Sequence, residues 1–318
     1  MSESHTQLRR LIFVVIRPRA SGDRERLERA LRELAQEDLT IGIAPGPTDG
    51  ETAVSGVGGL QLEIICDRVV REYKIPLDVG EFKVIYLETI RKNADGEGKY
   101  IRQIGGRGQY AHVKVRLEPR EAGGGYQFED EIRDGAVPAE FVEPVNLGIQ
   151  EAMKGGVLTG HEMVDLRAVL YDGSYHVGDS NEMAFRIAGS MAFKEAARKA
   201  DPVVLEPVMS VEVVTPEEFA GAILGDLSRR RGRIEGMEHR AGSQVIRATV
   251  PLATMIGYAQ HMRSITQGRV EYSMNFARYE EVPRGGESGA EEAGVTANKP
   301  KKPKAGSGFA AARWDEES

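Results

Sequence analysis

The sequence contains little of what several classes of protein depend on. Cys66 is the one cysteine among 318 residues, which excludes an internal disulfide framework and a cysteine-based zinc cluster. Such sparse use of cysteine is typical of a reducing compartment, and we expect a cytoplasmic protein. The apolar run LIFVVI at residues 11–16 is too short for a signal-peptide core or a membrane span, and arginines follow it at once. We therefore expect no membrane partner.

The sequence motifs of nucleotide-binding and hydrolytic enzymes are also missing. No G-x-x-x-x-G-K-[ST] loop, HExxH zinc motif or GxSxG elbow occurs. The nearest approach to a phosphate loop, DGEGKY at residues 95–100, lacks the first glycine and the final hydroxyl residue. We expect no catalytic residue, no metal site and no cofactor in this chain, so any nucleotide that it works with must be bound elsewhere.

Length and charge limit what the chain can be. Its 318 residues suffice for two or three domains, and 41% hydrophobic and 29% charged residues are typical of a soluble globular protein. The formal net charge is −7. Binding to RNA would therefore require a local basic surface on an acidic protein.

Hydrophobic periodicity predicts an α+β chain in which one pattern occurs twice. Residues 10–85 read as β-α-β-β-α with helices at 22–37 and 58–73 and a last strand near 81–88. Residues 207–283 repeat this order, which is that of a ferredoxin-like split β-α-β domain. The residues expected on the buried helix faces are Leu27, Leu31 and Leu34 in the first helix and Leu60, Ile64, Ile65 and Val69 in the second.

Residues 89–206 form a different unit between these two. Val113, Val115 and Leu117 alternate with polar residues, which predicts a half-buried strand. Residues 182–199 read as a helix that begins at a D-x-x-E signal, Asp179 and Glu182. The residues expected on its inner face are Ala184, Ile187, Ala188, Met191, Ala192 and Ala196.

The last segment and the sulfur-containing residues carry no predicted site. Residues 284–318 lack periodicity and are rich in glycine, alanine, lysine, proline and glutamate, which predicts a disordered tail. Its basic stretch KPKKPK is offset by acids at 315–317, so a solvated tail is favoured over an RNA-binding one. We interpret Cys66 as an inert thiol. The residues interpreted as core packing, and not as a cofactor site, are Met191, Met255, Met262 and Tyr258.

Three stretches can carry binding chemistry, and the first is IRQIGGRGQYAHVKVRL at residues 101–117. Glycines surround Arg107 between two strands, and residues 98–117 contain no acid. Glycine allows close approach of a phosphate, and arginine can bind it through two hydrogen bonds. A match to G-x-G-x-x-A is weak here, because a strand rather than a helix follows. The pattern fits a phosphate-binding hairpin and a tight hairpin with solvated charges equally well.

The second stretch is YDGSYHVGDSNE at residues 171–182. Two glycines bracket His176 just before a helix, whose free N–H groups favour anions. His176 can contact RNA, stack on a base, or act as a general base beside Asp172 or Asp179. On pattern alone, a histidine that only fills a turn is the favoured interpretation.

The third stretch is GDLSRRRG at residues 225–232. Arg229, Arg230 and Arg231 lie in the last turn of a predicted helix, where cations complement the helix dipole. Three arginines exceed what that role requires, so RNA contact is the alternative interpretation.

Taken together, these stretches resemble the C-terminal half of bacterial elongation factor G, namely its domains III, IV and V. The resemblance covers roughly residues 10–283. The motifs that carry it, in family order, are SGVGGLQLEII at 55–65, GGRGQYAHV at 105–113, DGSYHVGDSNEMAF at 172–185, ILGDLSRRRG at 223–232 and PLATMIGYAQHMRSITQGR at 251–269.

The resemblance implies an architecture and a partner. Residues 10–85 and 207–283 would be the ferredoxin-like domains III and V, and residues 89–206 the elongated α/β domain IV, which resembles a ribosomal protein domain. In the family, two loops at the tip of domain IV reach the codon–anticodon duplex in the decoding region, and a helix of domain V faces large-subunit RNA at the factor-binding site. The RNA-binding residues that this implies are Gly105, Gly106, Arg107, Gly108, Gln109, Tyr110, Ser174, Tyr175, His176, Asp179, Arg229, Arg230 and Arg231.

The sequence also departs from the family. The GTPase domain and the barrel domain of the family have no counterpart here, so we expect no enzyme activity and GTP only through a separate GTPase polypeptide. Val177 and Gly178 stand where the family usually has an acid and an aliphatic residue, and Ile104 replaces a usual serine. We expect a ribosome-binding factor acting in translocation. The alternatives are a ribosome-occupancy, protection or regulatory paralogue, a hydrolase that uses His176, and a degenerate fragment.

Overall fold

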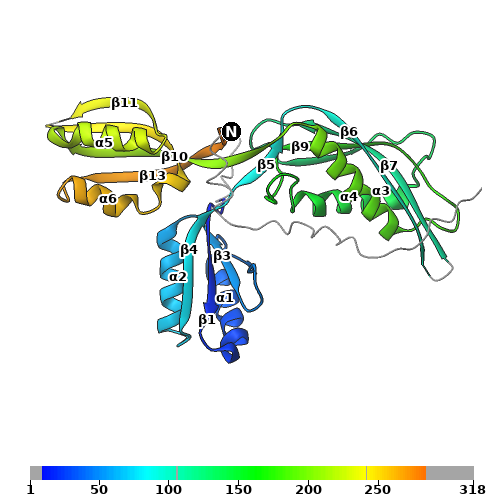
Figure 1. Cartoon of the computed structure of the whole chain (residues 1–318), viewed down its shortest axis with the longest axis horizontal. Coiled ribbons are helices and arrows are strands. Elements are labelled where there is room, and N and C mark those ends of the chain that lie inside the picture. The colour runs from blue at the N-terminus through cyan, green and yellow to red at the C-terminus, as the bar shows by residue number, and fades with distance from the viewer. Residues whose placement is uncertain (1–8, 105–106, 241, 284–318) are drawn as a thin grey trace, which may run out of the picture.

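The computed structural model describes residues 9–104, 107–240 and 242–283, which form three α+β units, each built on its own sheet (Figure 1). The three units meet at a central junction near β4, β5 and β10 (Figure 1). The predicted tail at residues 284–318 lies outside the described residues. Within the described part of the chain, no helix is long and apolar enough to cross a membrane.

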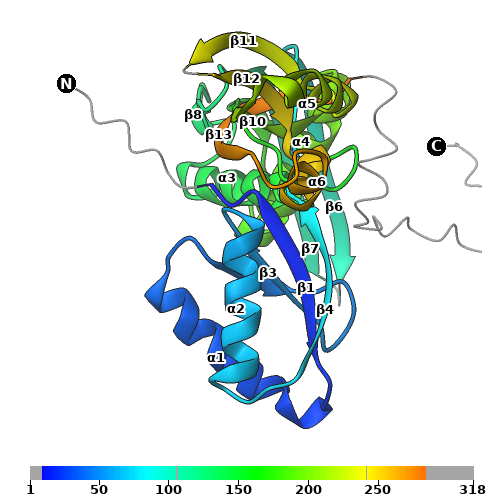
Figure 2. The same ribbon diagram turned by 90° about the vertical axis from the view of Figure 1, so that its left-hand side faces the viewer.

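The first unit has the predicted element order. Its elements are β1 (Ile12–Pro18), a 3-10 turn (Ser21–Asp23), α1 (Arg24–Glu37), β2 (Gly42–Pro45), β3 (Thr52–Gly56), α2 (Gly59–Arg71) and β4 (Leu77–Val84). The sheet order is β2-β3-β1-β4, and every pairing is antiparallel. Both helices pack against this sheet (Figure 2). The last strand ends four residues before the predicted limit, because Leu87 already begins a separate strand, β5 (Leu87–Ile90).

The two helices of this unit differ in how well their buried faces are predicted. Leu27, Leu31 and Leu34 of α1 are buried, as expected. On α2 the prediction is wrong for Leu60 and Ile64, which are 71% and 51% exposed. Two apolar stripes run along this helix, and the sheet covers the one formed by Leu62, Ile65, Cys66 and Val69.

The middle unit is a sheet with helices on one face. Its elements are β6 (Ala94–Ile104), β7 (Arg107–Pro119), β8 (Tyr126–Asp130), α3 (Ala139–Met153), β9 (Leu166–Ser174) and α4 (Glu182–Lys199). The sheet order is β6-β7-β9-β8, with β8 parallel to β9. Val113, Val115 and Leu117 of β7 are fully buried, as the alternation predicts.

Helix α4 occurs at its predicted position, but its start signal and inner face differ. Asn181 caps it by accepting a hydrogen bond from the N–H of Ala184 at 2.9 Å, so the cap is not Asp179. Met191 is exposed and Ile187 is only partly buried. The buried face consists mainly of small residues and two phenylalanines, and its members are Ala184, Phe185, Ala188, Gly189, Ala192, Phe193, Ala196 and Ala197.

The third unit repeats the topology of the first. Its elements are β10 (Pro202–Pro216), α5 (Glu217–Arg229), β11 (Arg233–Arg240), β12 (Ser243–Pro251), a 3-10 turn (Leu252–Met255), α6 (Tyr258–Ile265) and β13 (Glu271–Glu281). The sheet order β11-β12-β10-β13 matches β2-β3-β1-β4 when the strands of each unit are counted in chain order. Met255, Tyr258 and Met262 are buried, which confirms their interpretation as core packing, whereas for the exposed Met191 on α4 that interpretation is wrong.

The linkers between the units pair with each other. Strand β5 follows the first unit and runs antiparallel to the start of β10, with Leu87 opposite Leu205 and Ile90 opposite Pro202. Strand β10 then continues unbroken into the third sheet. The Tyr279 hydroxyl on β13 donates to the carbonyl of Ile85 at 3.2 Å. The junction is therefore held by the pairing of β5 with β10 and by the bond from Tyr279 on β13 to Ile85.

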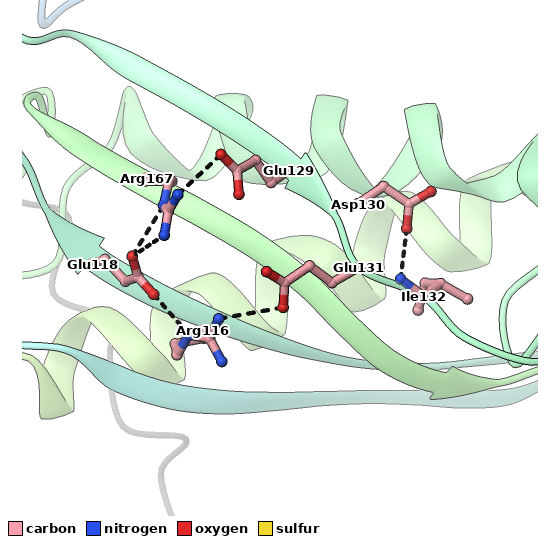
Figure 3. Close-up of polar contacts among 7 residues, drawn as sticks. All are labelled: Arg116, Glu118, Glu129, Asp130, Glu131, Ile132 and Arg167. Carbon is pink, nitrogen blue, oxygen red and sulfur yellow. Dashed lines mark hydrogen bonds and ion pairs between the residues drawn. The ribbon is translucent and has the colours of Figure 1, made fainter.

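The face of the middle sheet opposite the helices carries a network of ion pairs (Figure 3). Glu118 on β7 accepts from Arg116 at 2.8 Å and from Arg167 on β9 at 3.0 Å. Arg167 continues to Glu129 on the edge strand β8 at 3.0 Å, and Arg116 reaches Glu131 just beyond β8 at 3.4 Å. The network ties the edge strand to the centre of the sheet and pairs both of its arginines with carboxylates.

This network predicts a specific dependence of stability on pH. Burial opposes ionisation of Glu118, but hydrogen bonds from Arg167 and then Arg116 outweigh it, so the pKa of Glu118 lies below its usual 4.5. A lowered pKa in the folded state means that the stabilisation is complete above pH 4.5 and is lost as the pH falls through the folded value. We expect Glu118→Gln to cost about 1.5–3 kcal/mol at pH 7. Urea unfolding between pH 7 and pH 3 should show that the variant loses less stability on acidification.

The exposed loop residue Glu121 provides the control for this experiment. Glu121→Gln removes the same charge without touching the network and should follow the wild-type pH profile. Parallel profiles for wild type and Glu118→Gln would contradict the assignment of this acid-sensitive stability to Glu118.

Candidate nucleic-acid interface

The two loops singled out in the sequence lie side by side at one end of the middle unit. The β6–β7 hairpin supplies the first loop, and the connection from β9 to α4 supplies the second. We call the surface that these two loops form the tip. Antiparallel pairing of β7 with β9 places His112 opposite Ser174 and so brings the loops together. Gly105 and Gly106 lie outside the described residues, and for Arg107 the backbone alone is described.

Backbone hydrogen bonds hold the loops against each other. The N–H of Tyr110 donates to the carbonyl of Asp179 at 2.9 Å. The Ser180 hydroxyl donates to the carbonyl of Tyr110 at 2.8 Å and accepts from the N–H of His176 at 2.9 Å. Because Ser180 bonds both loops, it fixes their relative position and gives them one combined surface.

A second set of side chains supports the base of this surface. The hydroxyls of Tyr110 and Ser174 lie 2.8 Å apart, and Nδ1 of His112 lies 3.1 Å from the same Ser174 oxygen. Nε2 of His112 lies 2.8 Å from a carboxylate oxygen of Glu97. Tyr110 and Ser174 therefore act together within the tip, and His112 and Glu97 extend the network down the hairpin.

Two glycines fit the close geometry of the tip. Gly108 faces Asp179 so closely that a Cβ atom would lie 2.6 Å from its carboxyl carbon. Gly178 has a φ of +98°, a conformation that residues with a side chain rarely adopt. Gly178, which departs from the family pattern, thus has a steric reason, and a side chain at Gly108 would require the carboxylate of Asp179 to move.

The side chains beyond these contacts project into solvent. Tyr175 and Val177 are exposed, and His176 is 62% exposed. On the hairpin, Ile101, Arg102 and Gln103 are exposed in succession, so both faces of the strand lack cover at this point. A strand that is bare on both faces lies beyond the core. Together with the exposed rings of Tyr175 and His176, Arg102 on this strand gives the tip an aromatic and cationic surface suited to bases and phosphates.

The geometry around His176 does not favour catalysis. Nδ1 of His176 lies 3.2 Å from a carboxylate oxygen of Asp179. The other candidate partner, Asp172, accepts from Lys114 at 2.8 Å, and the hydrogen bond from Lys114 holds the pKa of Asp172 below its usual range. Ser180, the hydroxyl residue bonded to the loop, is engaged by backbone groups. These contacts give His176 a carboxylate partner but no positioned hydroxyl nucleophile of the kind that covalent catalysis uses. Among the described residues, no group of histidine, cysteine and acidic side chains could hold a metal ion.

The three arginines of the third unit have different surroundings. Arg231 donates two hydrogen bonds to the buried carboxylate of Glu206, at 2.9 and 2.6 Å. Arg230 bonds the buried Asp226 at 2.8 Å and lies over the ring of Tyr258. Arg229 is exposed at the end of α5, with its Nε 3.3 Å from the carbonyl of Gly225. Of the three, Arg229 is the best placed for an external anion.

This difference gives a prediction for two matched substitutions. Arg231→Ala leaves Glu206 buried without its partner, and we expect a loss of about 3 kcal/mol, the low end for broken buried pairs because the Arg231 side chain is partly exposed. Arg229→Ala should stay within about 0.5 kcal/mol of wild type. Urea unfolding measures both, and equal stabilities for the two variants would show that the Arg231–Glu206 pair contributes nothing.

Some functional features are outside the reach of the sequence analysis. Ile101 and Arg102 are recognisable as part of a strand, but their joint exposure depends on how far the helices extend along the sheet. The burial of the acid Glu88 is likewise not predicted by the sequence. The signal available for it is a single carboxylate inside the apolar run VIYLETI.

Comparison with known proteins accounts for nearly all of the described chain. A model of elongation factor G domain III matches residues 9–81, one of domain IV matches residues 82–201, and one of the elongation factor G C-terminus matches residues 203–286. A crystal structure of a protein from Thermus thermophilus is similar over 89% of this chain, with 39% sequence identity and a TM-score of 0.68. This chain spans 43% of the length of that protein. The chain therefore belongs to the elongation factor G family and comprises its domains III and IV and its C-terminal domain.

Proposed function

We propose that this protein binds the ribosome and acts in translocation, with the tip of its middle domain entering the decoding region. The observation that carries this proposal is the union of the hairpin loop and the loop of residues 173–181 into one exposed surface, joined by the bond between Tyr110 and Asp179. The repeated strand order supports a ferredoxin-like assignment for the first and third domains. The middle domain would correspond to the elongated, ribosomal-protein-like module.

The distribution of charge supports contact with RNA at the tip. Tyr175 and His176 offer exposed rings for stacking, and Arg102 offers a cation for phosphate. On the open face of the sheet, by contrast, Arg116 and Arg167 are already paired with carboxylates (Figure 3). RNA contact would therefore be concentrated at the tip, and binding would fall steeply as salt displaces phosphate contacts.

A second surface supports cooperation with a nucleotide-hydrolysing partner. Leu60 and Ile64 on α2 are exposed and line a depression of about 500 Å³ beside Gln61 and Arg68. Exposed apolar groups gathered in this way are typical of docking surfaces. We propose that the GTPase component of the reaction docks here, because the chemistry of GTP is not found in the three matched domains.

Ribosome co-sedimentation across a salt series tests the proposal. The test variant is Arg107→Ala/His176→Ala, and Arg198→Ala/His239→Ala is the matched control, since both of its residues are exposed and outside the tip. Loss of one stacked side chain costs about 1–3 kcal/mol, so we expect the tip variant to bind at least about fivefold more weakly. Equal binding by both variants, or no binding by the wild type at low salt, would refute the proposal.

The alternative function is occupancy of the ribosome without turnover, in competition with a full-length factor. The variant Leu60→Asp distinguishes translocation with a GTPase partner from occupancy of the ribosome. If the chain works with a GTPase partner, this variant should bind ribosomes normally but lose stimulation of translocation. If the chain acts by occupancy, wild type and Leu60→Asp should inhibit translocation by the full-length factor equally.

A further inference from the structure

A cleft of about 860 Å³ lies where the middle and third domains meet, away from the tip. Its walls come from β5, from the loop after β7, and from the last strand β13. Ile90, Leu205, Phe276 and Tyr279 form the apolar part of its lining. The proposed contact with the decoding region leaves this cleft without a role.

The polar lining of the cleft is positively charged although the protein is acidic overall. Five arginines and three carboxylates line it, which leaves an excess of two positive charges. Arg233 and Arg278 share the single carboxylate of Glu280, and their side chains are 73% and 53% exposed. The charged residues of the lining are Arg9, Arg91, Arg120, Arg233, Arg278, Asp165, Glu280 and Glu281.

We propose that this cleft binds the chain's own segment FAAARWDEE, residues 309–317. Its three consecutive acids complement the arginines, and Phe309 and Trp314 are large apolar groups that suit the floor of the cleft. The segment is the only part of residues 284–318 that joins aromatic rings to an acidic run.

The length of the tail makes this contact reachable. The last described residue is Pro283, which lines a small cavity that shares Arg233, Glu280 and Glu281 with the cleft. Twenty-five residues separate Pro283 from Phe309. A glycine-rich linker of that length has a root-mean-square span of about 25–30 Å, so the segment starts near its site and meets it at high effective concentration.

The lining favours an acidic peptide over a nucleic acid. Arg91 is held by Glu281 and Asp201, and Arg120 is held by the carbonyls of Gly124 and Gly125, so these two cations are already engaged. A short acidic segment needs only the exposed pair Arg233 and Arg278, together with the apolar floor.

Trp314 is the one tryptophan of the chain, so tryptophan fluorescence reports on this segment alone. In the 318-residue chain at low salt, we expect its emission to be blue-shifted and its quenching by acrylamide to be several-fold weaker than that of a free tryptophan. At roughly 1 M salt, where the Debye length is about 3 Å, both signs of protection should disappear. Neither fluorescence measurement requires a ribosome. An unprotected Trp314 would therefore not count against the proposed translocation function, and a failure to bind ribosomes would not count against the proposed contact of the tail.

Charge reversal identifies the cleft as the site. Arg233→Glu/Arg278→Glu should expose Trp314 at low salt, whereas Arg29→Glu/Arg32→Glu on α1 makes the same change in net charge and should not. Asp315→Arg/Glu316→Arg/Glu317→Arg should also expose Trp314. Combining this tail reversal with the cleft reversal should restore protection, which a merely unfolded variant cannot do.

Two outcomes would overturn the proposal. The first is a Trp314 that is equally accessible in the wild type and in every variant at low salt. The second is loss of binding to a single-stranded RNA oligonucleotide in Arg233→Glu/Arg278→Glu without any change at Trp314, which would assign the cleft to RNA.

Discussion

Replacing Glu88 by alanine should destabilise the middle domain by roughly 3–5 kcal/mol, the range for removing one partner from a buried charged network. Glu88 lies on β5 and is completely buried. Its carboxylate is surrounded by the loop that follows α3, in which five successive backbone N–H groups point at it. These donors are Val157 at 2.7 Å, Leu158 at 3.0 Å, Thr159 at 2.8 Å, Gly160 at 3.0 Å and His161 at 3.2 Å.

The size of this effect follows from what the substitution leaves behind. Buried N–H groups that lose their acceptor each cost about 1–3 kcal/mol unless the loop rearranges or water enters. Other contacts restrain the loop, because the N–H of Met163 donates to the carbonyl of Met153 at 2.9 Å and the ring centroids of Tyr86 and His161 lie 5.5 Å apart. Burial lowers the pKa of His161, so this histidine does not supply a compensating charge.

Glu88→Gln removes the negative charge but keeps the size of the side chain, so it measures how much the charge itself contributes to stability. A glutamine keeps one oxygen, which can serve the three N–H groups that now face Oε1 of Glu88, but its amide nitrogen would face the donors of Val157 and Leu158. We therefore expect a loss smaller than that of Glu88→Ala. Glu162→Ala, at an exposed acid beside the same loop, is the control and should be close to neutral.

Urea unfolding and hydrogen exchange check this prediction together. The amides of residues 157–161 should exchange slowly in the wild type and in Glu162→Ala, and much faster in Glu88→Ala. Because β5 also pairs with β10, protection at Leu205 should fall as well. Unchanged exchange of the loop amides in Glu88→Ala would show that the carboxylate does not hold the loop.

Glu88 also illustrates what the sequence could not predict. Its partners lie 69 to 73 residues further along the chain, and neither segment carries a pattern that refers to the other. The glycine-containing stretch KGGVLTGH reads as an ordinary loop until its N–H groups are seen to converge. Buried polar contacts of this kind depend on tertiary structure, whereas turns and helices are determined largely by residues that are close together in the sequence.

The dependence of burial on tertiary structure also explains why the buried face of α2 was predicted wrongly. Helix α2 has two apolar stripes, and spacing alone selects Leu60 and Ile64 as readily as Leu62 and Cys66. Which stripe is buried depends on where the sheet lies. At the tip, by contrast, local patterns predicted both loops and the helix start near residue 180, and the pairing of β7 with β9 was needed only to bring them together.

The tip itself depends on two buried glycines that lie away from it. Gly96 and Gly98 on β6 face α4 so closely that a Cβ on Gly98 would lie 1.9 Å from the carbonyl oxygen of Ala188. A Cβ on Gly96 would lie 2.1 Å from the carbonyl oxygen of Ala192. The alanines of the inner face of α4 and the glycines of β6 are therefore matched surfaces, and their small size lets helix and strand approach backbone to backbone.

We expect Gly98→Ala to cost about 3 kcal/mol, the upper end for overpacking a core, because the obstructing atoms belong to the helix backbone and cannot rotate away. Gly236→Ala is the matched control. Gly236 also lies in a strand, β11, but a Cβ there would meet no atom within 4 Å. Urea unfolding should separate the two variants clearly, and equal stabilities would mean that α4 can shift on the sheet without cost.

We expect Gly98→Ala to disturb the two loops of the tip as well as the packing of α4. Helix α4 begins at Glu182, directly after the loop that carries His176, while β6 leads into the hairpin that carries Arg107. If α4 is pushed away from β6, Asp179 moves away from Tyr110 and the two loops no longer share one surface. Gly98→Ala should therefore weaken ribosome binding even at temperatures where the domain stays folded, whereas Gly236→Ala should not. Normal binding by a destabilised Gly98→Ala would show that the loops find their places without the close contact between α4 and β6.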